Sequence, residues 1–452
     1  MNDLINYNKR TAETKKLFRS KKRNCFRKFA ENLNFRVNPT YVWNHCKILK
    51  NSILNIKAPH LSDYLQPDSD ISSTLDKITP PWAPTDPSYM PDCQRNDFLD
   101  SHFTFLEFNI ALEQKNDRSA PGLDGISFEI LKKLPINYKL LLLDLFNQMF
   151  SQSTFPDAWR EAYVHFIRKA EGRGYRPISL TSCSCKLFET MLKGSLQWWA
   201  ESGKWLPSSQ HGFRKSNSCS DNLANLTVTI ESAFKEGLEI YAAFVDIEGA
   251  FDKVNIDLLL KKLATKGASL RVVSFVKFAT AERFIFTDSN KKDCTVAHKG
   301  LPQGAVLSPL LHAIYAASIT DNLPPDVFAS CFADDVAIYT ISDPHSNKLA
   351  TLEEAIHTLD SNITNIALSI APKKSKFMHF HNSNFKPGDK QIKIKSHSIK
   401  SVGNNRFLGI ILDHKLTFDR HITHIHKRCM ASLNIIKSWL EPGGGLTLKL
   451  FF

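Results

Sequence analysis

Two adjacent aspartates, Asp334 and Asp335, interrupt the run CFADDVAIY, whose other residues are typical of a buried β-strand. Neighbouring side chains of a regular strand point to opposite faces, so both carboxylates reach one site only where the backbone bends. We therefore expect a hairpin with VFASCF and VAIYTI as its strands and the aspartates at their junction. Burying two like charges is costly unless a cation neutralises them, whereas a solvent-exposed turn needs no cation. The pair alone leaves both interpretations open.

A third carboxylate, Asp246, lies at the end of another apolar stretch, EIYAAFVDI. If the two stretches are neighbouring strands of one sheet, Asp246 and Asp334 can face each other. Mg²⁺ prefers such hard oxygen ligands and leaves its other positions to water and phosphate oxygens. Two of these ions about 4 Å apart can activate an attacking oxygen and stabilise a leaving one. The carboxylates therefore predict two Mg²⁺ ions, with Mn²⁺ as an alternative, and a phosphate chain that completes them.

The order of strand-like and helix-like segments predicts an α+β fold. Two strand pairs, within VFASCFADDVAIYTI and within RFIFTDSNKKDCTVAHKG, have the pattern of antiparallel hairpins. We therefore expect a sheet in the split βαβ style with helices on one face, and not a doubly wound parallel sheet. Neither GxGxxG nor GxxxxGKS/T occurs, so dinucleotide binding and P-loop hydrolysis have no support.

The same patterns set expected limits for several elements. SDNLANLTVTIESAFKEG predicts a helix with Ser220 as its N-cap and Gly237 as its stop. GAVLSPLLHAIYAASI predicts a long apolar helix over residues 304–319, and a further strand is expected at about 406–412.

Two glycine-containing loops carry candidate ligand-binding side chains. KGLPQGAVLSPLL places a proline and two glycines around Gln303, and glycines let a backbone or a ligand approach closely. In FIRKAEGRGYRPISL, Lys169 and Arg176 flank a turn, as expected of a cationic hairpin tip that binds phosphates. The plainer alternatives are an ordinary loop at a helix start and a surface turn.

These motifs together resemble those of a known family. AFVDIEGAFDKV, GLPQGAVLSPLL and FADDVAIY, in this order, resemble the palm motifs of reverse transcriptases. SAPGLDGISFEILKKLP, GYRPISLT and QHGFRKSNSCSDNL resemble the finger motifs of the non-LTR (LINE-type) retrotransposon branch. LSIAPKKSKFMHF and RFLGIILDHKLTF resemble its last palm motif and its primer grip. The closest likeness is to the insect jockey-type elements.

The resemblance implies a right-hand polymerase with fingers, a ferredoxin-like split βαβ palm and a partial thumb. It implies an RNA-directed DNA polymerase, in which a primer 3′-hydroxyl attacks the α-phosphate of a dNTP and pyrophosphate leaves. The implied partners are an RNA template, a DNA primer and dNTPs. A nucleic-acid-binding remnant without turnover, inactive or domesticated, is the alternative that stays open.

The resemblance also implies roles for individual residues. Asp246, Asp334 and Asp335 would be the catalytic, metal-binding carboxylates, and the carbonyl of Ile247 would help to hold one metal. In the nucleotide site, the ring of Phe251 would exclude a 2′-hydroxyl, and Gln303 and Gly304 would line the pocket for the nucleotide and the template. Lys169 and Arg176 would bind the triphosphate, and Lys374 would lie near the leaving pyrophosphate. Lys373 and Lys376 compete with Lys374. The primer grip would be Phe407, Leu408 and Gly409, and Arg214 would contact nucleic acid.

Two short stretches depart from the family pattern. Gly249 stands where an alanine or a lysine is commoner, and the usual proline-glycine-lysine run near Lys169 is replaced by RKAEGRG. Neither change removes a catalytic group. The sequence ends at GGGLTLKLFF, so we expect a truncated thumb over 421–452, after fingers and palm over 100–420.

The basic charge is concentrated near the N-terminus. The formal net charge is +13, and residues 9–28 hold ten Lys and Arg against one Glu. We expect a basic helical extension over 1–57, with Lys21, Lys22, Arg23 and Arg27 contacting phosphates, then a Pro/Asp/Ser-rich linker over 58–99. A solvated basic helix is the alternative for residues 9–28.

Cysteine use and hydropathy bear on the compartment. The nine cysteines are scattered and never form CxxC, which indicates reduced thiols and not a disulfide framework. The sequence has no apolar run long enough to span a bilayer, and its first residues lack the layout of a signal peptide. We expect an intracellular protein, nuclear or cytoplasmic, with no membrane partner, and the sequence leaves its oligomeric state open.

The basic extension yields a prediction about salt dependence. Deleting residues 1–50 should lower RNA affinity for all sequences alike and flatten the slope of log K against log salt, because phosphate contacts release counterions. Single-turnover chemistry on a saturated complex should survive. Titrations of both proteins at several salt concentrations measure the slopes, and a solvated helix predicts that they stay equal.

Overall fold

The computed structural model describes residues 69–79, 89–169, 174–280, 282–287, 293–343, 346, 348–382 and 388–437, besides three isolated positions nearer the N-terminus. The phosphate contacts expected in the basic extension, at Lys21, Lys22, Arg23 and Arg27, lie outside these residues. The chain divides into two compact units, Asp68–Phe418 and a second that joins Met1–Pro67 to Asp419–Phe452. The described part of the second unit is essentially one helix, α13 (Asp419–Lys437), which begins near the expected start of the thumb.

A four-stranded antiparallel sheet is the centre of the larger unit. Its order is β6 (Val327–Phe332), β7 (Asp335–Ser342), β3 (Glu239–Asp246) and β8 (Lys376–Phe380). Because β7 is antiparallel to both of its neighbours, β3 and β6 run parallel with β7 between them. The predicted α+β class and the hairpin with the aspartates at its junction are confirmed.

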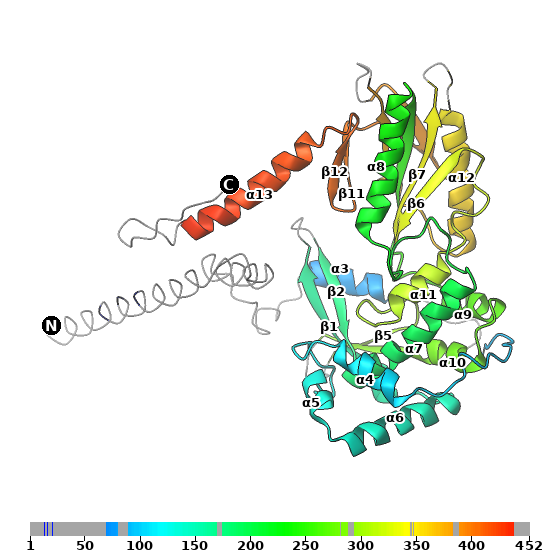
Figure 1. Ribbon diagram of the computed structural model, residues 1–452, viewed down its shortest axis with the longest axis vertical. Helices are drawn as coiled ribbons and strands as arrows, with labels where there is room; N and C mark the ends of the chain where they lie inside the picture. The colour runs from blue at the N-terminus through cyan, green and yellow to red at the C-terminus, as the bar shows by residue number, and fades with distance from the viewer. Residues whose placement is uncertain are drawn as a thin grey trace. The chain divides into compact units, whose positions relative to one another are not determined.

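Helices cover both faces of this sheet, so the prediction of helices on one face is wrong. Alternate β3 residues Ile240, Ala242 and Phe244 pack with α8 (Cys219–Lys235), and the residues between them pack with α12 (Leu349–Asn365). Figure 1 shows α8 and α12 beside β6 and β7. The reason lies in the strand itself, because residues buried on both faces need cover on both. Apart from its last residue, β3 is buried throughout.

A second sheet has the order β2 (Tyr175–Leu180), β1 (Glu161–Arg168), β4 (Arg283–Phe286) and β5 (Cys294–Ala297). The β1–β2 and β4–β5 pairs are antiparallel hairpins, as predicted, and β1 pairs with β4 in parallel. Helix α3 (Ser69–Ile78) packs against β2.

Helix α3 lies within residues 58–99, the segment expected as a linker or as a stretch draped over the surface. Its Ile78 lies in a cluster with Val164, Phe166 and Tyr175, so this part of the segment is folded onto the sheet. The prolines before and after it masked the helix, because they dominate the composition of the segment.

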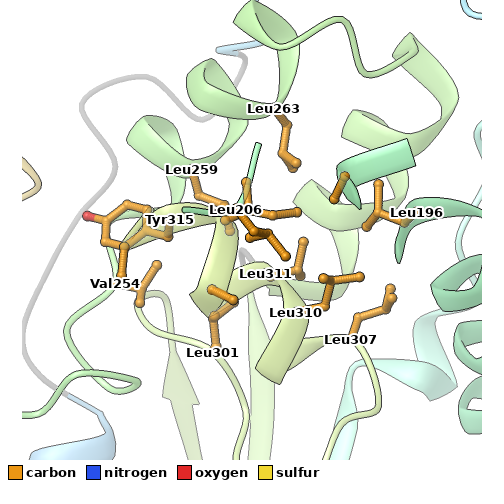
Figure 2. Packing of buried hydrophobic residues seen from close by; sticks show 14 of the residues in the cluster. Leu196, Leu206, Val254, Leu259, Leu263, Leu301, Leu307, Leu310, Leu311 and Tyr315 are labelled. Atoms are coloured by element: carbon orange, nitrogen blue, oxygen red, sulfur yellow. The ribbon is translucent and has the colours of Figure 1, made fainter. Parts of the chain in front are cut away.

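The largest core joins the helices around the two sheets. Helix α12 contributes to this core, together with α4 (Phe105–Glu113), α5 (Phe128–Lys133), α6 (Ile136–Ser151), α7 (Cys183–Ser202), α9 (Ile256–Thr265), α10 (Leu270–Thr280) and α11 (Ser308–Tyr315). Figure 2 shows part of it, where leucines of α9 and α11 meet Leu196, Leu206 and Leu301. None of the helices in the described ranges is both long enough and apolar enough to cross a membrane.

Three expected element limits differ from the structure. The N-cap of α8 is Ser218, which forms a capping box with Asp221, so the helix begins one residue before the expected cap, Ser220. Helix α11 is shorter than 304–319, because the loop before Ser308 is held by other contacts described below. The strand expected at 406–412 is a hairpin of β11 (Asn404–Phe407) and β12 (Ile410–Asp413). A further hairpin, β9 (Gln391–Ile394) with β10 (His397–Lys400), precedes it.

Candidate active site

Three carboxylates meet at one end of the β6–β7–β3–β8 sheet. Phe332 pairs with Asp335, so Ala333 and Asp334 form a two-residue turn, and Ala333 has a φ of +60°. Across the next ladder the partner of Asp335 is Asp246, the last residue of β3. The prediction that the two strands are neighbours in one sheet is confirmed. The residue directly opposite Asp246 is Asp335, whereas Asp334 was expected there.

The electrostatics of this cluster reflect crowded negative charge. Burial, followed by the charges of Asp334 and Asp246, raises the pKa of Asp335 to about 6. Burial also raises the pKa of Asp246, although Lys374 opposes the shift with its Nζ 3.5 Å from Oδ1 of Asp246. Because Lys374 is 67% exposed, this single lysine is a weak counter-charge for three carboxylates.

The donor set suits a hard divalent cation that other ligands complete. Nowhere in the described ranges do three or more His, Cys, Asp or Glu side chains form a metal cage by themselves. Mg²⁺ commonly takes only one or two carboxylates and fills its remaining positions with water and phosphate oxygens. The bridge between Ile247 and Ile370 uses the N–H groups of Glu248 and Ala371, so it does not engage the Ile247 carbonyl.

A cleft of about 1310 Å³ opens beside the carboxylates. Its wall brings together residues from motifs far apart in the sequence: Lys169, Arg176, Asp246, Ile247, Phe251, Gln303, Gly304, Asp334 and Lys374. Of the three competing lysines, Lys374 lines this cleft, and Lys373 and Lys376 do not.

The loop around Gln303 is tied to strand β2. The N–H of Ser179 donates to the Gln303 carbonyl at 2.7 Å, and the Gln303 side chain donates to Oδ1 of Asp252 at 3.1 Å. Gly304 has a φ of +124°, and a Cβ there would lie 2.5 Å from the Ser179 carbonyl oxygen. A side chain at this position is therefore excluded twice, by conformation and by space.

Phe251 forms part of the cleft wall and is backed by a buried histidine. Its ring stacks on His312 with a centroid distance of 4.5 Å and an interplanar angle of 16°. His312 is fully buried, and burial lowers its pKa to about 4, so the ring is neutral at physiological pH. Phe213 contacts Phe251 edge-on at 6.3 Å. These contacts fix the plane of the Phe251 ring.

Two basic side chains flank the turn of the β1–β2 hairpin. Lys169 directly follows β1 and Arg176 is the second residue of β2, and both side chains are exposed. Thr74 and Lys77 of α3 line the same cleft, and the sequence interpretation missed them. Their signal was the segment SDISSTLDKI, which has a polar start and an apolar residue every three or four positions.

The comparisons with known proteins match the segment that forms this cleft. Residues 167–412, more than half of the 452-residue chain, match the family described as reverse transcriptase (RNA-dependent DNA polymerase). The chain belongs to this family. It is 27% identical over 344 residues to the probable RNA-directed DNA polymerase from transposon BS of Drosophila melanogaster, which covers 74% of this chain and 38% of that protein.

Two further relatives extend the match to jockey-type elements. The chain is 28% identical over 346 residues to the RNA-directed DNA polymerase from mobile element jockey of Drosophila melanogaster, covering 73% of the chain and 37% of the relative. The probable enzyme from transposon X-element is 28% identical over 338 residues, covering 72% and 36%. This reverse transcriptase chain spans less than two fifths of the length of these relatives. The resemblance seen in the sequence is confirmed.

In this reverse transcriptase chain the candidate primer grip is a tight turn. Leu408 and Gly409 join β11 to β12 with φ values of 45° and 89°. Phe407 is buried and packs on Phe244, with ring centroids 5.0 Å apart. Phe407 therefore anchors the hairpin beside β3, and within the turn Leu408 packs on the same apolar cluster while Gly409 is exposed.

The expected nucleic-acid contact of Arg214 is not supported. Its guanidinium forms a bidentate pair with Glu201, at 2.9 and 2.6 Å, and also donates to the carbonyls of Pro207 and Gln210. The side chain is only 16% exposed. Arg214 thus fastens its own loop to α7, and the reverse transcriptase motif that contains it has a structural explanation.

A buried carboxyl group holds the loop that follows Gln303. Glu189 on α7 accepts a hydrogen bond from the N–H of Val306 at 2.8 Å, three residues after Gln303. Burial raises its pKa to about 7, against the opposing effects of that bond and of two lysines. A single acidic residue inside the apolar helix sequence CSCKLFETML was the available signal.

Glu189 makes the stability of this protein depend on pH. The folded carboxyl holds a proton up to about pH 7, whereas the unfolded one releases it near 4.5, so the free energy of unfolding falls as pH rises between these values. Glu189→Gln keeps an acceptor for Val306 and removes the charge. At pH 8 the variant should be more stable by about 1–3 kcal/mol, and this difference should shrink toward pH 5.

Denaturant midpoints at pH 5 and pH 8 measure the effect. Glu231→Gln, on the exposed side of α8, is the matched control and should change neither midpoint. Parallel pH profiles of wild-type and Glu189→Gln protein would contradict a buried titrating carboxyl.

Proposed function

We propose that this chain is the fingers, palm and start of the thumb of an RNA-directed DNA polymerase of a mobile element. The carrying observation is the cleft in which Asp246, Asp334, Phe251, Gln303 and the cations of the β1–β2 hairpin come together. The strand order β6–β7–β3–β8, with β7 inserted between the parallel β3 and β6, supports its assignment as a ferredoxin-like split βαβ palm. The sheet of β2, β1, β4 and β5 is assigned to the fingers, and α13 to the thumb.

In the proposed reaction the carboxylates hold two divalent ions. Asp246, Asp334, Asp335 and the Ile247 carbonyl are the ligands from this chain. When bound, Mg²⁺ supplies activation of the primer 3′-hydroxyl and charge stabilisation of the leaving pyrophosphate. The pKa values of Asp246 and Asp335, raised first by burial and further by the neighbouring carboxylates, support this assignment, because a bound cation would stabilise the charged forms.

The other residues of the cleft position the dNTP. Lys169 and Arg176 bind the triphosphate, where the planar guanidinium of Arg176 can engage two oxygens at once. The Nζ of Lys374 lies 3.5 Å from Asp246, and its exposed ammonium would stabilise the negative charge of the leaving pyrophosphate. Leu408 and Gly409 hold the primer end, so the attacking hydroxyl stays aligned with the α-phosphate.

Phe251 is the proposed discriminator between sugars. A ring fixed between His312 and Phe213 leaves no room to yield to a 2′-hydroxyl, so dNTPs bind and rNTPs clash. Gln303 and Gly304 shape the neighbouring pocket for the base and the template.

A binding protein without turnover is the second candidate. It would keep the basic N-terminal segment and the cleft, yet need no divalent ion and no carboxylates. The presence of Asp246, Asp334, Asp335 and Gln303 in one site favours the enzyme. Primer extension on an RNA template with Mg²⁺ and dNTPs separates the two candidates.

Removing one carboxylate charge should abolish extension. Asp246→Asn or Asp334→Asn keeps the side-chain size and removes a negative metal ligand, which is worth several kcal/mol, or a rate loss of roughly 1000-fold or more. RNA affinity and the unfolding midpoint should stay close to wild type.

Asp326→Asn is the matched control for this test. Asp326 precedes β6, at the end of that strand remote from the Asp334 turn, and pairs with Lys348 on the surface. It should extend primers at the wild-type rate. Extension above background by either active-site variant would contradict the carboxylate assignment.

A smaller residue in place of Phe251 should relax sugar selection. Phe251→Val opens space beside the nucleotide without touching a proposed metal ligand, so the ratio of dNTP to rNTP incorporation should fall by roughly tenfold or more, about 1.4 kcal/mol. Phe328→Val, at a ring that is 45% exposed on β6, is the control and should keep the ratio. An unchanged ratio in Phe251→Val would mark the ring as ordinary packing.

A further inference from the structure

A buried amide side chain grips the turn that carries the aspartates. Oε1 of Gln210 accepts hydrogen bonds from the N–H of Ala333 at 3.0 Å and from the N–H of Gly212 at 2.8 Å. Its Nε2 donates to the carbonyl of Ala333 at 3.3 Å. Gln210 is 3% exposed and lies 123 residues from Ala333 in the sequence. One side chain therefore holds both backbone polar groups of the turn residue immediately before Asp334.

This turn needs an external support. Ala333 is not glycine, yet it has a φ of +60°, a region that L-residues avoid. Ala333 also lies beyond Phe332 and Asp335, the last pair of the β6–β7 ladder. Backbone groups buried at such a point must find partners outside the ladder, and a strained conformation persists only when its surroundings enforce it.

The segment that carries Gln210 is itself attached to the edge of the sheet. The N–H of Cys331 donates to the carbonyl of Ser209 at 2.8 Å, and the N–H of His211 donates to the carbonyl of Cys331 at 2.9 Å. Gly212 approaches so closely that a Cβ there would lie 2.3 Å from the backbone nitrogen of Ala333. The segment 209–212 thus lies directly against the turn.

The rear of the segment is fastened to α7. Arg214 donates to the carbonyl of Gln210 at 3.1 Å while it pairs with Glu201 on that helix. Phe213, which directly precedes Arg214 in the sequence, contacts both Phe251 and Phe332. A continuous set of contacts therefore runs from α7 through Gln210 to Ala333, with a branch to the proposed sugar discriminator.

We propose that Gln210 is a positioning residue that fixes the geometry of the catalytic turn. This inference rests on the proposed function, because it assigns the reason for the grip to the placement of Asp334 and Asp335. Gln210 touches no substrate and acts through Ala333. The plain alternative is a glutamine that only satisfies buried polar groups and contributes to stability.

Two variants of the same shape test this role. Gln210→Met fills the space and removes all three hydrogen bonds, whereas Gln210→Glu keeps two acceptors for the N–H groups and loses the donor to the Ala333 carbonyl. The control is Asn362→Leu, since the Asn362 amide similarly holds the carbonyls of Ile319 and Asp321, outside the cleft.

The measurements separate positioning from stability. Single-turnover extension at saturating dNTP should fall about 100-fold in Gln210→Met, the scale expected for catalytic groups displaced by about 1 Å. RNA affinity and the apparent dNTP affinity should not change. Asn362→Leu, which also removes amide hydrogen bonds to backbone carbonyls, should keep the wild-type rate. Gln210→Glu should extend faster than Gln210→Met, because it retains the bond to the Ala333 N–H.

Amide hydrogen exchange provides a readout that does not depend on activity. The Ala333 N–H should exchange faster in Gln210→Met than in wild type, with protection partly restored in Gln210→Glu. A wild-type rate in Gln210→Met, or a rate loss no larger than that of Asn362→Leu, would overturn the proposal. If the wild-type chain itself fails to extend primers, the proposed function fails. Exchange then still decides whether the grip exists, since unchanged exchange at Ala333 overturns it.

Discussion

The register that places Asp335 opposite Asp246 is the constraint on which the rest of the structure depends. Two like charges meet across the β3–β7 ladder, and nothing in their mutual interaction favours that arrangement. It is held by the apolar residues that precede Asp246 in β3, which are buried between α8 on one face and α12 on the other. The burial of apolar side chains thus holds together carboxylates that would otherwise repel each other. A slip of one residue would turn each side chain to the opposite face and separate the carboxylates.

Several unrelated segments converge on that register. The β11–β12 hairpin reaches it through the contact of Phe407 with Phe244, and the Gln303 loop reaches the segment that follows β3 through the hydrogen bond from the Leu301 N–H to the Phe251 carbonyl. The Gln210 segment attaches to the turn itself. Apolar contacts and hydrogen bonds to the backbone position these supports, and the exposed cations Lys169 and Arg176 face the same cleft. Such a division leaves the cleft-facing groups available for a ligand.

The sequence predicted the parts of the site that depend on local pattern. Alternation and turn residues were enough to place Asp334 and Asp335 in a hairpin, and the apolar stretch before Asp246 was enough to place it at a strand end. Contacts that depend on tertiary structure were not predictable in this way. Only the folded structure shows that Gln210 and Glu189 are buried. The sequence around Arg214 does not distinguish an arginine that binds phosphate from one that pairs with Glu201. The second helical layer on the sheet was missed, although the unbroken burial of β3 was its physical signal.

The hydrogen bond between Ser179 and Gln303 links two parts of the cleft mechanically. Arg176 and Ser179 lie three residues apart on one strand, and this short β-segment is stiff along its length. The carbonyl of Gln303 therefore takes its position from the same strand that carries Arg176. Because β2 is paired along its length with β1, Arg176 and the Gln303 loop share one rigid frame. Two sides of the cleft that are more than 120 residues apart in the sequence thus keep a fixed spacing through a single backbone hydrogen bond.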